Sequence, residues 1–218
     1  LTITGGFIAV FGLIKSHQKS ELEREQLEVQ KQKDSREHIR QLHNSYSDRF
    51  DKAVTELNSG DSKDAFAAVY KLVHLADDWL EYKDLSDNEE EQNKLKNRAQ
   101  KETQTIIDIL CKYIRGSFPL AENRRDIESS TSNMYTSADR QALRDEQEVR
   151  RLIFEEISLR LSTLDENLNI HQGRWSEFKF NFSQAPIFYK MSGLTFEQLE
   201  LSTLKFFGDI EFQDSIFI

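Results

Sequence analysis

The side chains that could carry chemistry in this 218-residue chain are its five histidines, its single cysteine and a few acidic clusters. The histidines lack the HExxH and zinc-finger spacings that bring metal ligands together. His38 and His43 lie five residues apart on a polar helical stretch, which separates them by about 140° around a helix, so we expect no shared ligand. The full set is His17, His38, His43, His74 and His171.

The cysteine and the acidic residues also favour structural roles. A lone Cys111 excludes an intrachain disulfide, and its strongly apolar helical surroundings predict a buried thiol rather than a nucleophile. Asp77 and Asp78 come near the end of a helical pattern and are predicted to be surface carboxylates rather than an acid–base pair. The acidic run at 87–91 lacks the glycine of an EF-hand loop.

Other catalytic signatures are missing from the sequence. It contains neither the Gly-x-Ser-x-Gly nucleophile elbow nor a phosphate-binding loop, because Gly5, Gly6 and Gly12 are not followed by Lys-Ser/Thr. We therefore expect a protein that is not an enzyme, with no catalytic, cofactor-binding or metal site and no evident small-molecule substrate.

Composition and charge narrow the class of protein. The net charge of −9 argues against unaided binding to nucleic acid, because phosphate contacts require clustered Lys and Arg. With 38% hydrophobic residues and a mean hydropathy of −0.65, the chain corresponds to one large domain or two small ones.

The first segment, Leu1 to Ile14, is uncharged and predicts a membrane anchor. As a helix it would be about 21 Å long, shorter than the ~30 Å hydrocarbon core, so we expect it to be the C-terminal part of a transmembrane helix. Gly5 and Ala9 would permit close helix contact. A signal peptide is the alternative, although no small-residue cleavage site follows. Lys15 and Lys19 predict that the bulk of the chain is cytoplasmic.

Residues 15–45 are expected to form a charged juxtamembrane helix. No Gly or Pro occurs from Ser16 to Leu57, and acidic and basic residues are dense and mixed. Leu22, Leu27 and Val29 are out of heptad phase, so this helix is predicted to be solvated or to form a weak coiled coil with a second chain.

Apolar residues at helical spacing predict a helical domain over 46–165. The first helix is expected to stop near 58–60, and the next to begin at a cap formed by Asp61 or Ser62. The apolar face of this next helix consists of Phe66, Val69, Leu72, Val73, Ala76 and Leu80.

The rest of the predicted helical domain contains two more helices and a loop. An acidic connection at 84–93 leads to a helix that Gly116 and Pro119 should end. A mobile polar loop is expected at 116–137 and a fourth helix at about 138–165. The residues expected at the centre of the helix pair are Leu72, Val73, Ile107 and Leu110.

The C-terminal tail has an apolar pattern that repeats every five residues. A helix requires a step of 3.6 and a strand a step of 2, so neither explains it, whereas a solenoid of short units does. An ordinary series of alternating β-strands is the alternative. We expect Trp175 and the preceding helix to cover the N-terminal end of the solenoid. The residues expected to point into its core are Phe182, Ile187, Phe196, Leu201, Phe206, Phe212 and Phe217.

One unit of the tail, Asn181-Phe-Ser-Gln-Ala185, resembles the repeat of the pentapeptide-repeat proteins. This resemblance implies a right-handed quadrilateral β-helix with four units to a coil. The repeats are degenerate, because large residues such as Phe180 and Leu199 occupy a position that the family fills with small ones. The expected fold is thus mainly α with a C-terminal β segment, in which a degenerate pentapeptide-repeat β-solenoid occupies 174–218.

The order of segments resembles bacterial membrane-anchored pentapeptide-repeat proteins, most closely at 49–57, 65–79 and 103–115. This resemblance implies a membrane-tethered, non-catalytic scaffold that binds another protein or associates with itself. An acidic inhibitor that mimics DNA is the alternative. It is disfavoured because the repeat stretch makes fewer than two coils and the chain from Arg174 onward has six acidic and four basic side chains.

Overall fold

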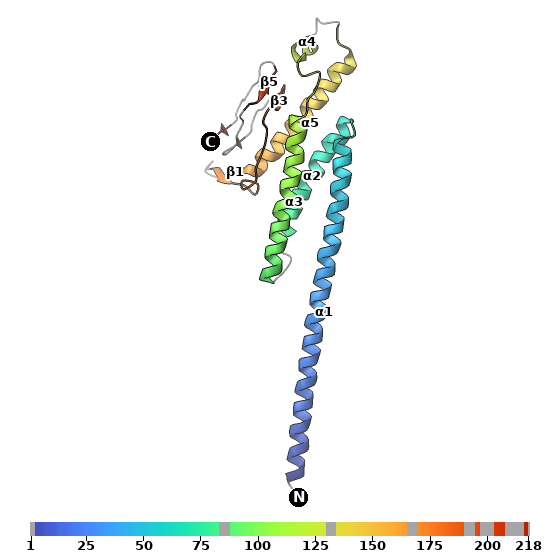
Figure 1. Ribbon diagram of the computed structural model, residues 1–218, viewed down its shortest axis with the longest axis vertical. Helices are drawn as coiled ribbons and strands as arrows, with labels where there is room; N and C mark the ends of the chain where they lie inside the picture. Colours follow the sequence, from blue (N-terminus) through green and yellow to red (C-terminus); the bar gives the residue numbers. More distant parts are fainter. Residues whose placement is uncertain are drawn as a thin grey trace. The chain divides into compact units, whose positions relative to one another are not determined.

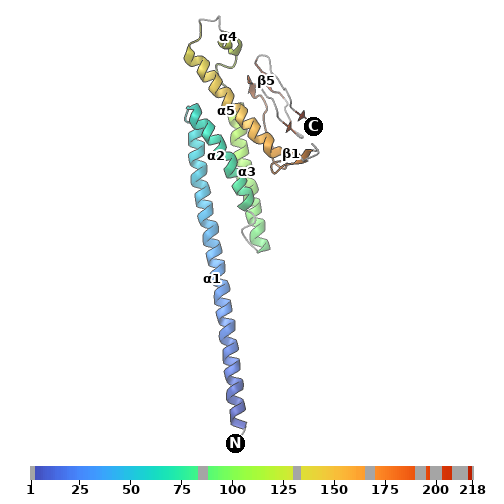
Figure 2. The same ribbon diagram turned by 180° about the vertical axis from the view of Figure 1, so that it is seen from behind.

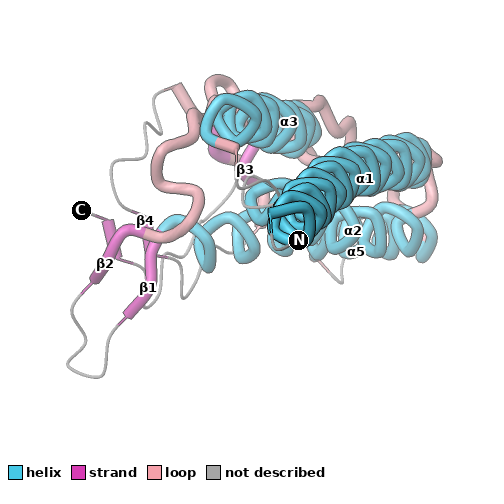
Figure 3. The backbone as a smooth tube through the Cα atoms, turned by 90° about the horizontal axis from the view of Figure 1, so that it is seen from below, coloured by secondary structure: helices cyan, strands magenta, loops and turns pink. Residues whose placement is uncertain are grey.

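The computed structural model describes residues 3–82, 88–129, 134–164, 170–189, 195–196, 203–207 and 216–217. The chain divides into two compact units, Leu1–Ser47 and Asp48–Ile218. The described residues are mainly helical, and short strands follow the helices (Figure 1, Figure 3), as expected for the fold class. The helices are α1 (Ile3–Leu57), α2 (Ser62–Tyr82), α3 (Glu89–Arg115), α4 (Arg124–Glu128) and α5 (Ser137–Leu161). The strands are β1 (Ser162–Leu164), β2 (Ile170–Gln172), β3 (Pro186–Ile187), β4 (Thr195–Phe196), β5 (Lys205–Phe206) and β6 (Ile216–Phe217).

Helix α1 is continuous through the segments predicted as anchor, juxtamembrane helix and start of the helical domain. Its residues 19–38 are exposed, including Leu22, Leu27 and Val29, as expected for a solvated helix of mixed charge. Within the part of the chain that the structure describes, no helix is long and apolar enough to cross a membrane.

The turn from α1 to α2 forms where the sequence predicts it. The Asn58 side chain donates to the Val54 carbonyl at 2.7 Å, and Gly60 adopts a φ of +83°, which a residue with a Cβ rarely takes. The Asp61 carboxylate then accepts from the Lys63 backbone N–H at 2.8 Å, which satisfies one of the free donors at the start of α2.

Helices α2, α3 and α5 pack on one another and enclose the core of the second unit (Figure 1, Figure 2). The Thr103 hydroxyl crosses the α2–α3 contact and donates to the Ala76 carbonyl at 3.3 Å. The four residues expected at the centre of the helix pair are all 0% exposed: Leu72, Val73, Ile107 and Leu110.

Helix α3 begins earlier than expected, within the residues interpreted as an acidic connection. The Asn88 side chain accepts from the Glu91 backbone N–H at 3.0 Å and caps the helix. Glu89 to Glu91 occupy the first turn, where negative charge favours the helix dipole. Residues 88–91 of the acidic run are therefore a helix start, while residues 84–87 of the connection lie outside the described residues.

The loop expected at 116–137 contains the short helix α4. Ala121 and Ile127 are buried, and the Arg140 guanidinium of α5 donates to the Ile127 carbonyl at 3.0 Å. The polar composition of this segment predicts a mobile loop, but these two apolar residues pack on the domain. The prediction was therefore wrong for α4. Residues 130–133 lie outside the described residues.

Helix α5 ends at Leu161, four residues before the predicted end near 165. The residues that follow form β1, which pairs antiparallel with β2 from Ser162 opposite Gln172 to Leu164 opposite Ile170. This hairpin was not predicted. Gly173 and Trp175 then donate backbone hydrogen bonds to the carbonyls of Leu161 and Arg160, so the chain returns to the end of α5.

The four remaining strands form two parallel pairs, in which each strand pairs with the next but one along the chain. Strand β3 pairs with β5, with Ile187 beside Phe206, and β4 pairs with β6, with Phe196 beside Phe217. The first pair of partners is nineteen residues apart along the chain and the second is twenty-one apart. Two non-glycine residues with positive φ, Gln184 at 61° and Thr203 at 64°, are also nineteen apart. Each lies two residues before its strand, so the chain repeats a turn and a strand at this interval.

Burial in the tail follows the predicted columns only at the beginning. Phe182 and Ile187 are 0% exposed, but Phe206 is 51% exposed, so its predicted place in a common core is wrong. Aromatic rings of the helical part cover the earlier segment, because Phe154 of α5 lies 4.8 Å from the ring of Phe182. The side chains of the other predicted column members, Phe196, Leu201, Phe212 and Phe217, lie outside the described residues.

Candidate functional site

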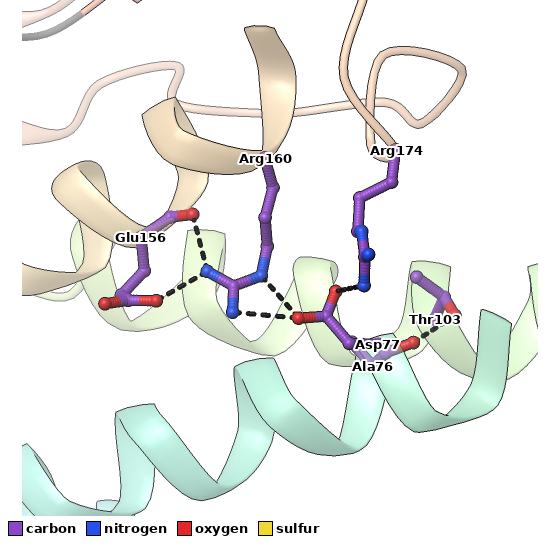
Figure 4. Close-up of polar contacts among 6 residues, drawn as sticks. All are labelled: Ala76, Asp77, Thr103, Glu156, Arg160 and Arg174. Carbon is purple, nitrogen blue, oxygen red and sulfur yellow. Dashed lines mark hydrogen bonds and ion pairs between the residues drawn. The ribbon is translucent and has the colours of Figure 1, made fainter. Parts of the chain in front are cut away.

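Charged residues of α2, α5 and the start of the tail gather around Asp77, on the face of α2 toward α5 (Figure 4). Its Oδ2 atom accepts from Nε of Arg160 at 2.9 Å and lies 2.9 Å from Nη2 of the same guanidinium. Its Oδ1 atom lies 3.4 Å from Nη1 of Arg174. The Asp77 side chain is 16% exposed, so it is not the surface carboxylate that the sequence predicted.

Arg160 connects the three parts of the structure that meet here. Besides Asp77 of α2, its guanidinium pairs with Glu156 one turn earlier on α5. The same group stacks over the ring of Trp175, with 5.3 Å from Cζ to the ring centroid. Trp175 is 0% exposed, as expected for a residue between helix and tail. The Asp77 cluster, defined as Asp77, Glu156, Arg160 and Arg174, therefore fastens α2 and α5 to the start of the tail (Figure 4).

A second charged group closes the C-terminal end of α3. Arg150 of α5 is 2% exposed and donates to the carbonyls of Ile114 and Gly116 at 2.8 and 2.9 Å. These carbonyls belong to the helix end, where oxygens lack intrahelical partners and a positive charge favours the dipole. Glu146 balances the guanidinium, accepting from its Nε at 2.6 Å and from the Tyr113 hydroxyl at 2.9 Å.

Tyr113 acts as a donor in this arrangement. Burial, together with the negative charge of Glu146, raises the pKa of Tyr113 above its ordinary value. The hydroxyl therefore stays protonated at neutral pH and can keep its hydrogen bond to the carboxylate. The three carboxylates discussed here, Asp77, Glu146 and Glu156, are each held by a guanidinium group, which suits them to joining elements rather than to accepting protons from a substrate.

Cys111 is 1% exposed, which confirms the predicted buried thiol. Burial raises the pKa of Cys111 to about 11. A nucleophilic cysteine requires the thiolate, so this residue is unsuited to that role at neutral pH.

The histidines lie on separate stretches of the described chain. His38, His74 and His171 are exposed and His43 is half-buried, while the side chain of His17 lies outside the described residues. Among the residues that the structure describes, no three His, Cys, Asp or Glu side chains come together in a way that could hold a metal ion.

No family model, curated protein or solved structure matches this chain. The resemblance to pentapeptide-repeat proteins therefore rests on the residues alone.

Sequence reasoning missed both arginines that organise the charged groups. Each follows a glutamate by four residues on α5, Arg150 after Glu146 and Arg160 after Glu156. This spacing is also usual for exposed helix pairs. What distinguishes Arg150 is its helical spacing from apolar residues that are buried: Leu143 lies seven residues before it, and Ile153 and Ile157 lie three and seven residues after it.

Proposed function

We propose that the chain is a membrane-tethered, non-catalytic scaffold whose second unit binds another protein. The Asp77 cluster supports this proposal, because its ion pairs join α2 to α5 and to the start of the tail. A rigid connection of this kind suits a protein that presents surfaces at fixed positions.

We further propose that the tail winds as a β-solenoid of the pentapeptide type. The parallel pairs β3–β5 and β4–β6 support this, because alternating strands that pair at intervals of nineteen and twenty-one residues fit a coil of four five-residue units. The backbone bonds from Lys205 to Ala185 and from Phe207 to Ile187 continue the ladder on both sides of β5. Exposed Phe206 shows that the apolar column of an ideal coil is not maintained.

The membrane tether is supported by the uncharged segment Leu1 to Ile14 and the positive flank at Lys15 and Lys19. Cell fractionation with an alkaline carbonate wash tests it on the full-length protein. We expect the protein in the membrane pellet, and we expect a Phe7→Lys, Phe11→Lys double variant in the supernatant because charge in a hydrocarbon core is costly. Leu22→Lys, in the exposed part of α1, is the control and should stay in the pellet. Recovery of the unmodified protein in the supernatant would contradict the tether.

A further inference from the structure

An open groove lies where the first turns of α2 and α5 meet the end of α3. It consists of two adjoining hollows with volumes of about 680 and 320 Å³. Both hollows are lined by Ser62, Lys63 and Asp145, so they form one continuous surface, which we call the α2–α5 groove.

Small side chains line both walls of this groove. Ser62 and Ala65 are three residues apart on α2, and Ala138 and Ala142 are four apart on α5, so each pair lies on one face of its helix. Ala65 and the neighbouring Leu57 are buried and give the groove an apolar floor.

Charge on the groove is predominantly acidic. Its lining includes Asp61, Asp145, Glu146 and Glu148, and Lys63 is the one cationic side chain among the lining residues. Glu146 is already balanced by buried Arg150, and Glu148 pairs with Arg151 at 2.6 Å, whereas Asp145 accepts from a neutral side chain, Gln141, at 2.6 Å. Negative charge therefore remains at the rim for a partner.

An aromatic pair lies at one end of the groove. Phe66 lines the smaller hollow and is 38% exposed, and Tyr70 one turn later on α2 is exposed to the same extent. Their rings pack edge to face with centroids 5.6 Å apart. Partly exposed aromatic residues beside an acidic rim offer an apolar anchor for a partner that also carries positive charge.

We propose that the α2–α5 groove binds a basic amphipathic α-helix of another protein. The apolar face of that helix lies on Ala65, Phe66 and Ala142, and its Lys and Arg side chains reach the carboxylates at the rim. Charge complementarity selects this occupant, and walls made of helices favour helix-in-groove binding over strand addition. This inference rests on the proposed scaffold function, since it names the class of partner.

The test measures binding of a synthetic peptide to the purified full chain by fluorescence anisotropy. The probe is a labelled helical peptide about five turns long with leucines on one face and lysines on the other. A peptide of the same composition in scrambled order and one with glutamate in place of lysine are the peptide controls. We expect the amphipathic lysine peptide to bind in a saturable, salt-sensitive manner and the other two peptides to bind about tenfold more weakly or not at all.

Two matched substitutions separate the groove from the general charge of the protein. Asp145→Lys lies in the groove, and Asp108→Lys on α3 makes the same change of charge elsewhere; both aspartates accept from a glutamine four residues earlier. Ala142→Trp fills the groove without changing charge. We expect Asp145→Lys and Ala142→Trp each to weaken binding by about tenfold and Asp108→Lys by less than about twofold.

The outcomes divide clearly. Equal weakening by Asp145→Lys and Asp108→Lys, or equal binding of the amphipathic and scrambled peptides, overturns the proposal in favour of non-specific attraction to an acidic protein. Unchanged circular dichroism of each variant shows that a loss of binding is not a loss of folding. The membrane tether is tested separately by fractionation, so peptide binding can fail while the tether holds, and the reverse.

Discussion

Gly173 packs so closely against Arg160 that a Cβ on Gly173 would lie 2.2 Å from the Arg160 carbonyl oxygen. The contact is with backbone, which cannot move aside as the end of a flexible side chain would. The Gly173 backbone N–H also donates to the Leu161 carbonyl at 2.7 Å. The return of the chain to the end of α5, and with it the position of Arg174 beside Asp77, therefore depends on a residue without a side chain.

Gly173→Ala should destabilise the second unit by about 1–3 kcal/mol through steric overlap with the α5 backbone. Denaturant unfolding followed by tryptophan fluorescence measures this, because Trp79 and Trp175 are both buried. Gly60→Asn is the matched control: Gly60 has φ of +83° with nothing within 4 Å of an added Cβ, and Asn tolerates this backbone region. We expect the control to change stability by less than about 1 kcal/mol. Equal midpoints for Gly173→Ala and the unmodified chain would rule out the close packing.

Asp77→Ala should cost about 1–3 kcal/mol, because it removes the α2 partner of the largely buried Arg160 guanidinium, whose charge Glu156 still balances. Asp78→Ala is the neighbouring control. It removes an ion pair with Arg49 whose side chains are 38% and 44% exposed, and pairs of this kind contribute about 0–1 kcal/mol. The same fluorescence-detected unfolding compares the two variants. Similar costs for both would show that the Asp77 cluster does not fasten the tail.

Stability should fall as the pH rises above about 9, because burial raises the pKa of Cys111 from 9.0 to about 11. The unfolded chain then loses the thiol proton at lower pH than the folded chain, so a rise in pH favours the unfolded state. The expected loss is about 1 kcal/mol between about pH 9 and 10, below the range in which tyrosines dominate. Cys111→Ala should remove this part of the pH dependence when unfolding midpoints are compared over the same interval. Identical slopes for the two proteins would contradict the assignment.

The helical part of the fold could be predicted because its signals are local. Buried Leu72 and Leu110 belong to apolar patterns within single helices, and the turn at Gly60 is marked by its own residue types. Asp77 and Arg160 are eighty-three residues apart in the chain. No local pattern records a pairing over that distance, so the central cluster could not be read from the sequence.

The tail shows where a real pattern gave a wrong placement. The five-residue step predicts equivalent positions for Ile187 and Phe206, and the two residues do lie side by side in parallel strands. Spacing does not specify what covers each strand, however. Rings of Phe154 and Phe118 pack against the segment around β3, through Phe182 and Phe188. This cover depends on α5 and on the loop after α3 rather than on the repeat.

The difference between these two strand partners gives the last prediction. Ile187→Ala should destabilise the second unit by about 2–4 kcal/mol, because the side chain is 0% exposed and its loss leaves a cavity. Phe206→Ala removes a larger side chain, yet it should cost less than about 1.5 kcal/mol, because that side chain is 51% exposed. Unfolding monitored by tryptophan fluorescence measures both, with Leu159→Ala, which truncates an exposed residue of α5, as the control. A cost for Phe206→Ala equal to or above that for Ile187→Ala would restore the buried column that the sequence predicts. The expected order instead confines the core of the tail to the segment that α5 covers.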